Sequence, residues 1–226
     1  SQPGFLQVDS GTTLTVNGAF TGNAINKVGD GTLILNSLQY YNTTTNIAGG
    51  TLQLNGGLNT IFANGAAVPG TTQIDAGATL DLNGNTQYVA NFGSPGSGLA
   101  GTGGTLTTTA GTPLFVTRDS GTFGGQITGT MNLGRIGGGT FALTDASSVT
   151  GALTLMGGTT SLRDDATLLN LSSIDVHFAT LELHNNTSLQ TQLANRLADT
   201  MPITLRGGFI TYNGRVSTAA TETLGP

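Results

Sequence analysis

Apolar and polar residues alternate in short blocks along this chain, and one kind of block occurs four times. It consists of Thr, Leu, a variable residue, an aliphatic residue and Asn, and it starts within two residues of a Gly, at 13–17, 32–36, 51–55 and 79–83. Alternation with a period of two is typical of a β-strand that buries one face. The pattern therefore predicts short strands whose leucines all point to the same side.

The blocks belong to a longer internal repeat. Segment 7–18 aligns without gaps on segment 73–84. Further matches lie 108 residues apart, at 29–32 with 137–140 and at 49–51 with 157–159. Short repeats with connections of variable length are typical of stacked coils.

We therefore expect an all-β protein whose fold is a parallel β-helix (solenoid). Residues 1–226 are expected to form a single segment of a longer protein, with internal copies at approximately 5–108 and 109–226. At about 20–25 residues a coil, the chain would make roughly nine to eleven coils. With about 4.8 Å a coil, the rod would be about 45–55 Å long. A β-sandwich, which also uses short strands and frequent turns, is the alternative.

Stacked coils would place equivalent side chains in columns. We expect a column of buried leucines, which comprises Leu14, Leu33, Leu52, Leu80 and Leu181. We also expect an internal ladder of side-chain amides, which comprises Asn17, Asn36, Asn55 and Asn83. The alternative for these asparagines is that each only ends its strand, because Asn and Gly both suit turns.

Two segments depart from the repeat. Residues 93–98 are Gly- and Ser-rich and have no strand periodicity, which predicts an exposed loop. Residues 188–198 place Leu189, Leu193 and Leu197 at i, i+4 and i+8, with Pro202 beyond them. This spacing predicts a short helix on the flank of the rod, with a flanking strand as the alternative.

The composition excludes several functions. Only 8% of the residues are charged, the net charge is −5, and Lys27 is the only lysine. Nucleic-acid binding needs clustered cations, so no nucleic-acid partner is expected. The chain has no Cys, which excludes disulfides and thiolate chemistry. It also lacks the roughly 18-residue apolar stretch of a membrane helix, so we expect no direct membrane span in this segment.

Candidate chemistry is sparse, and most acidic residues follow the repeat. Asp9 and Asp75 occupy the same repeat position, and the adjacent Asp164 and Asp165 would face opposite ways on a strand. A glycoside-cleaving site needs two or more convergent carboxylates. We therefore expect no catalytic residue, with a polysaccharide lyase or hydrolase as a minor alternative.

The chain has two histidines, His177 and His184. Neither belongs to a set with the spacing of metal ligands, so we expect no metal site and no cofactor. Lys27 and Arg135 share a repeat position just before a Gly-rich turn. Either they contact an acidic glycan, or their stems pack over the rod with their charged ends in water.

Segment 25–35, Ile-Asn-Lys-Val-Gly-Asp-Gly-Thr-Leu-Ile-Leu, continues to Gly-Gly-Thr-Leu-Gln-Leu at 49–54. It resembles the autotransporter-associated β-strand repeat, whose pattern is Lys-x-Gly-x-Gly-Thr-Leu-x-Leu followed about one coil later by a Gly-Thr-Leu strand. Residues 123–129 look like the lead-in to a second copy at 135–143, where Arg135 replaces the Lys. The resemblance implies a β-helical segment of a large exported bacterial surface protein, such as an autotransporter passenger domain.

We therefore expect a non-enzymatic stalk or fibre segment, located outside the cell or at the bacterial cell surface and associated with the outer membrane through a part outside this segment. Its expected partners are neighbouring repeats of the same chain or further copies of it, which would join end to end into filaments. The alternative is an adhesin that binds a glycan or extracellular matrix through loops between coils, such as Asn91–Gly104.

Overall fold

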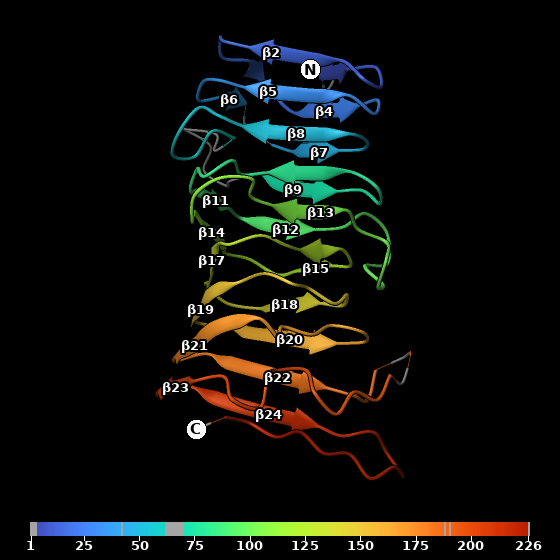
Figure 1. Ribbon diagram of the computed structural model, residues 1–226, viewed down its shortest axis with the longest axis vertical. Helices are drawn as coiled ribbons and strands as arrows, with labels where there is room; N and C mark the ends of the chain where they lie inside the picture. The colour runs from blue at the N-terminus through green and yellow to red at the C-terminus, as the bar shows by residue number, and fades with distance from the viewer. Residues whose placement is uncertain (1–3, 42, 62–69, 188, 190, 226) are drawn as a thin grey trace.

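The structure is a computed structural model that describes residues 4–41, 43–61, 70–187, 189 and 191–225. These residues form short strands and no helix. Every pairing between named strands is parallel. The strands lie one above another along a rod, with the two ends of the chain at opposite ends (Figure 1). The all-β prediction is confirmed, and the parallel sheets of short strands are consistent with a β-solenoid rather than with the antiparallel pairing of a sandwich.

Each circuit of the chain passes three faces of the rod in the same order. The first face consists of two consecutive sheets, β1-β4-β7-β9-β12 and β15-β18-β20-β22-β24. Their strands are β1 (Gly4–Gln7), β4 (Ile25–Val28), β7 (Thr45–Ile47), β9 (Thr71–Ile74), β12 (Asn91–Gly93), β15 (Gly121–Phe123), β18 (Thr140–Leu143), β20 (Thr159–Arg163), β22 (Thr180–His184) and β24 (Phe209–Asn213). The two sheets adjoin where the Ser94 amide donates to the Thr122 carbonyl at 2.9 Å, so one row of strands runs along the whole rod.

The second face is well formed only in the first half of the chain. Its sheet contains β2 (Thr13–Val16), β5 (Thr32–Leu35), β8 (Thr51–Leu54), β10 (Thr79–Asp81), β13 (Thr105–Thr107) and β16 (Gln126–Ile127). Beyond β16, the face is reduced to isolated parallel bridges that join Ser147, Leu168 and Leu197.

The third face changes in the opposite direction. It begins with the two-residue strands β3 (Thr21–Gly22) and β6 (Tyr40–Tyr41). Its later strands are β11 (Gln87–Val89), β14 (Leu114–Thr117), β17 (Asn132–Ile136), β19 (Gly151–Met156), β21 (Leu171–His177) and β23 (Ile203–Arg206). The longest is the seven-residue β21. The second face therefore has full strands in the first half of the chain, and the third face has its longest strands in the second half.

The predicted leucine column lies on the inner side of the second face. Strand pairing puts Leu14, Leu33, Leu52 and Leu80 directly over one another, and the last three are fully buried. Leu14 is 39% exposed, because it lies on the last described strand of this sheet and has a neighbour on one side only. Parallel, in-register pairing therefore converts a repeated Leu in the sequence into a continuous apolar core.

Leu181, the fifth leucine of the expected column, lies elsewhere. It is buried in β22 on the first face, between Thr160 and Ile210. The sequence match at 179–183 therefore falls on a different face from Leu80. The reason is that the second face has no full strand in that part of the rod, so the Thr-Leu pattern there serves the first face.

Matching turns of the two expected internal copies also lie at different corners of the rod. The Gly-rich turn at 29–31 joins β4 to β5, which is a corner between the first and second faces. Its sequence equivalent at 137–139 joins β17 to β18, a corner between the third and first faces. The same turn sequence is thus used at two different corners of the rod.

The helix predicted over 188–198 is wrong for the part that the structure describes, while Ser188 and Gln190 lie outside the described residues. Leu197 is buried and forms a parallel bridge to Leu168, whereas Leu189 is 50% exposed. The Leu168 amide also donates to the Arg196 carbonyl at 2.8 Å. Because the neighbouring coil uses these backbone groups, the segment forms the reduced second face instead of a helix.

We predict that Gly31→Ala destabilises the protein by about 2 kcal/mol or more. A Cβ at this position would overlap the carbonyl oxygens of Asp9 and Thr12 in the preceding coil, and backbone atoms cannot rotate away. Gly18→Ala is the matched control, because a Cβ there meets no atom within 4 Å. Urea denaturation followed by circular dichroism measures both. Equal stability of the two variants would contradict the close stacking of the coils.

Candidate functional site

The four predicted ladder asparagines are joined side chain to side chain. Each Nδ2 group donates to the Oδ1 atom of the preceding member: Asn36 to Asn17 at 2.8 Å, Asn55 to Asn36 at 2.8 Å, and Asn83 to Asn55 at 3.2 Å. The ladder runs along the outside of the rod, and not inside it as expected. Its first three members are exposed, because each Asn directly follows the last inward-pointing residue of its strand. The ladder therefore tightens a corner of the rod in solvent.

The described cations that are fully buried have backbone carbonyls as their main partners. Lys27 Nζ donates to the carbonyls of Gly29 at 2.7 Å, Gly49 at 2.9 Å and Val28 at 3.2 Å. It thereby joins two consecutive Gly-rich turns. Both interpretations of Lys27 from the sequence, a glycan contact and a charged end in water, are wrong, since the side chain is 0% exposed. Burial lowers the pKa of Lys27.

Arg135 repeats this arrangement at its own corner. Its guanidinium donates to the carbonyls of Arg118, Gly137 and Gly138, and burial lowers its pKa. Like Lys27, it is buried and reaches neither a glycan nor water. The side chain at the Lys-or-Arg position of the repeat thus donates hydrogen bonds to the carbonyl groups of the turn.

Arg196 is a third cation of this kind, and the sequence repeat does not identify it. It is buried and donates to the carbonyls of Asp164 at 2.9 Å, Ala166 at 2.8 Å and His184 at 3.1 Å, and to Asn185 Oδ1 at 2.8 Å. Its backbone amide donates to the Glu222 carboxylate at 2.9 Å. It therefore ties three successive circuits together.

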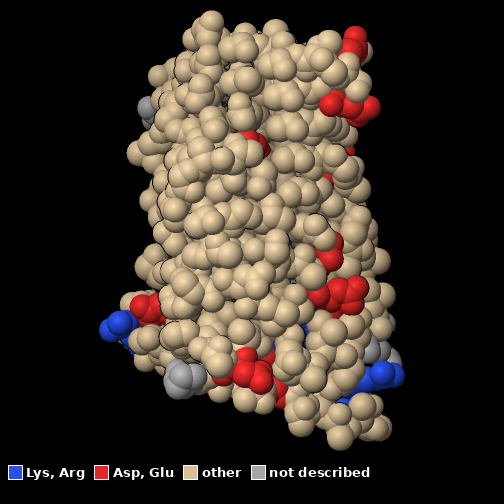
Figure 2. All heavy atoms as spheres, viewed as in Figure 1, with Lys and Arg blue, Asp and Glu red and all other residues tan. Residues whose placement is uncertain are grey.

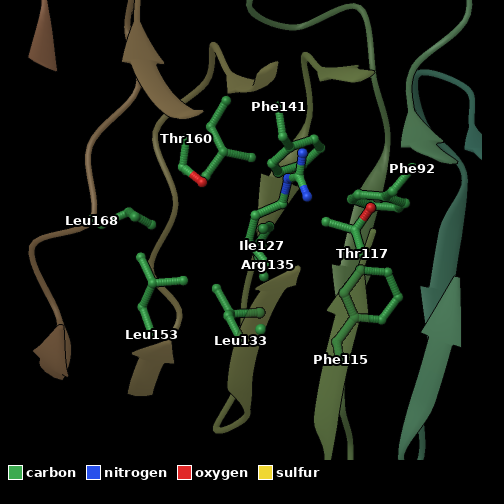
Figure 3. Close-up of a pocket in the computed structure, with 12 residues that line it drawn as sticks. Phe92, Phe115, Thr117, Ile127, Leu133, Arg135, Phe141, Leu153, Thr160 and Leu168 are labelled. Atoms are coloured by element: carbon green, nitrogen blue, oxygen red, sulfur yellow. The ribbon is translucent and has the colours of Figure 1, made fainter. Parts of the chain in front are cut away.

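A hollow of about 30 Å³ lies inside the rod beside Arg135 (Figure 3). Phe92 contacts Phe115, Phe123 and Phe141 there, with ring centroids 4.9, 4.4 and 6.3 Å apart. The Arg135 Nε atom and the Thr160 hydroxyl are buried and have no hydrogen-bond partner among the described groups. The hollow has room for about one or two water molecules, so it is too small to be a substrate pocket.

The carboxylates and histidines do not form a shared centre in the described part of the chain. Asp175 pairs with His177 at 3.0 Å and with Arg206 at 3.3 Å, which lowers the pKa of Asp175 in spite of the opposing desolvation. His184 lies 3.7 Å from Glu182. Among the described residues, no group of three or more His, Cys, Asp or Glu could hold a metal ion.

The adjacent Asp164 and Asp165 lie in the turn after β20 and not on a strand. Asp164 is buried and Asp165 is exposed, so they face opposite ways. The main-chain carbonyls of Asp9 and Asp75, and not their carboxylates, both accept the amide three residues on, from Thr12 at 3.1 Å and from Ala78 at 3.0 Å. They therefore hold equivalent turns of the repeat.

The surface in view is almost uncharged, with scattered acidic groups and with basic groups near the C-terminal end (Figure 2). The expected loop at 93–98 is only partly exposed: Gly93, Ser94 and Gly98 are buried, whereas Gly96 and Ser97 are exposed. It packs on the outer side of the first face, where the Thr144 hydroxyl donates to the Gly98 carbonyl at 2.6 Å.

No family model, curated protein or solved structure matches this chain. No helix of the described residues has the length and apolarity needed to cross a membrane. The geometry on its own must therefore indicate what the chain does.

We predict that Asn36→Ala costs about 1 kcal/mol of stability, because it removes a donor to Asn17 and an acceptor for Asn55. Asn36→Asp keeps an acceptor and should recover part of that loss. The exposed Asn186→Ala is the control and should change stability by less than about 0.5 kcal/mol. Chemical denaturation measures all three. An Asn36→Ala protein as stable as the control would show that the ladder is only a by-product of stacking.

We predict that Lys27→Met costs about 2–4 kcal/mol at pH 7, since it leaves buried turn carbonyls without donors. The folded pKa of Lys27 is lowered, so the unfolded chain binds more protons between that pKa and about 10.4. The wild type should therefore gain stability over Lys27→Met as the pH rises through this window. Denaturation curves of both proteins between pH 7 and 10.5 measure this gain. A constant difference would contradict the burial of a charged Lys27.

Proposed function

We propose that this chain is a parallel β-helix that serves as a non-enzymatic stalk or fibre segment of a large exported bacterial protein. The supporting observation is that rows of equivalent groups follow the rod axis. They are the leucines of the second face, the outer asparagines, and the buried cations that donate to turn carbonyls. Interactions of this kind hold one coil to the next and leave little chemistry for a substrate.

The surroundings expected from the sequence fit this role. A surface with few charged groups, as in Figure 2, suits a spacer that binds its neighbours weakly. The resemblance to autotransporter-associated repeats supports a passenger domain at or beyond the bacterial cell surface. At about 4.8 Å a strand, the row of strands on the first face makes a rod of about 45 Å.

Partners of such a segment would be further coils. Among the described strands, β1 and β24 each pair with one neighbour on the first face, so an additional coil can add to either edge by parallel pairing. That coil would belong to the parent protein or to another copy of this chain. Joining of copies end to end would give filaments.

We predict that the rod lengthens when whole coils are added. Four extra copies of residues 37–55, inserted after Asn55, should add about 19 Å, because Asn36 and Asn55 occupy equivalent corners. Cryo-electron microscopy of the parent protein measures the length, and labelling of intact cells measures its surface display. Four copies of a scrambled 19-residue sequence are the control and should unfold the segment.

Two results would contradict the proposal. One is an insertion variant that misfolds as the scrambled control does, since a stalk built of coils tolerates whole coils. The other is saturable cleavage of an acidic polysaccharide that is lost on substitution of one carboxylate, which would make the chain an enzyme.

A second candidate function is an adhesin that binds a glycan through a loop between coils. The observation that favours it is the loop at 94–104, which packs on the outside of the first face and lines a polar cleft. A rod that presents such a cleft could serve as a spacer and a binding surface at once.

A further inference from the structure

The polar cleft on the outside of the rod is built from four separate coils, those of β12, β18, β20 and β22. It has a volume of about 190 Å³. The loop at 94–104 forms one wall and the end of β20 forms the floor. Its lining residues are Ser97, Gly98, Leu99, Thr144, Arg163, Asp164, Thr187 and Leu189.

The loop wall is held in place before any ligand arrives. Ser94 Oγ accepts the Gly124 amide at 2.8 Å, and the Gly103 amide donates to the Gly124 carbonyl at 3.0 Å. In the middle of the loop, the Thr144 hydroxyl donates to the Gly98 carbonyl at 2.6 Å. Pre-organisation of this kind reduces the entropy lost on binding.

Arg163 supplies a cationic edge to the cleft. It is half-buried, and its Nη2 atom donates to the Thr122 hydroxyl at 3.2 Å. No carboxylate among the described residues lies within ion-pair distance of it. Guanidinium groups bind carboxylates through two parallel hydrogen bonds, so this side chain can receive an anionic group from a ligand.

Asp164 supplies fixed acceptors beside that cation. Its side chain is almost fully buried, its φ is +54°, and its Oδ1 atom accepts the Thr187 hydroxyl at 2.5 Å. Asp adopts a positive φ more readily than most residues, and here it fixes the direction of the side chain. The buried Arg196 is close enough to interact electrostatically with Asp164 and offsets its charge.

We propose that this cleft binds one sugar residue that carries a carboxylate, such as a uronic acid of an acidic glycan. Arg163 pairs with the carboxylate, while Asp164 and the exposed Ser97 bond to ring hydroxyls. The exposed side of Leu99 packs against the C–H face of the ring. The cleft is smaller than the roughly 300–1,000 Å³ pockets of drug-sized ligands, so it takes one ring and leaves the rest of the glycan in solvent. This inference rests on the second candidate function and not on the stalk.

The test is binding of methyl glucuronide to the whole chain, measured by saturation-transfer NMR and calorimetry. Methyl glucoside, acetate and inorganic phosphate are the comparison probes. We expect millimolar binding of the glucuronide and at least tenfold weaker binding of the glucoside. Arg163→Gln should weaken glucuronide binding at least tenfold, and Arg163→Lys should retain part of it. Arg206→Gln, which removes an exposed arginine on the third face, should have no effect.

Circular dichroism of each variant shows whether it is folded. If Arg163→Gln does not fold, the comparison of wild type with Arg163→Lys still tests the role of the guanidinium group. Equal affinity for glucoside and glucuronide would overturn the role of Arg163. Binding of acetate or phosphate as tight as that of glucuronide would show a plain anion site and overturn the sugar. No binding of glucuronide at about 20 mM, a concentration well above a millimolar dissociation constant, would overturn the inference. It would not affect the stalk proposal, which the coil-insertion experiment tests separately.

Discussion

Parallel pairing in register, between residues one circuit apart, is the constraint on which the rest of this structure depends. It places Thr32 beside Thr51 and Leu33 beside Leu52, so that like residues stack on like. A repeated Leu then becomes a core, and a repeated Asn becomes an amide ladder. A shift of one residue would move every leucine of a strand to the outer side. The Gly-rich corners preserve the register, because Gly31 and Gly50 lie too close to the preceding coil to accept a side chain.

The buried cations address a problem that this constraint creates. Tight corners leave carbonyl groups that have no partner within a strand, and such groups are costly when buried. Lys27, Arg135 and Arg196 each supply several donors to these carbonyls. Because most of their partners are dipoles of the backbone, the charges fasten coils together mainly through carbonyl groups, although the buried Asp164 lies close to Arg196. The polar cleft differs from this scheme, since Arg163 has donors that the rod does not use.

The sequence was sufficient for the features that follow directly from the repeat. Periodicity predicted the strands, and the repeated Thr-Leu-x-aliphatic-Asn block predicted the column of Leu33, Leu52 and Leu80. It was insufficient where the three faces change width. Leu181 moves to the first face, and Leu197 joins a bridge, although its spacing is helical. The burial of Lys27 and the cleft at Arg163 depend on contacts between coils, which composition and spacing do not specify.

The central claim is tested most directly by scalar coupling across hydrogen bonds in solution NMR. The structure has the Thr51 amide bonded to the Gly31 carbonyl, the Thr79 amide to that of Gly50, and the Thr105 amide to that of Ala78. Couplings between these three nitrogen and carbon pairs are the predicted result. Couplings that instead link each of these strands to its neighbour in sequence, in an antiparallel pattern, would contradict the stacked coils and everything inferred from them.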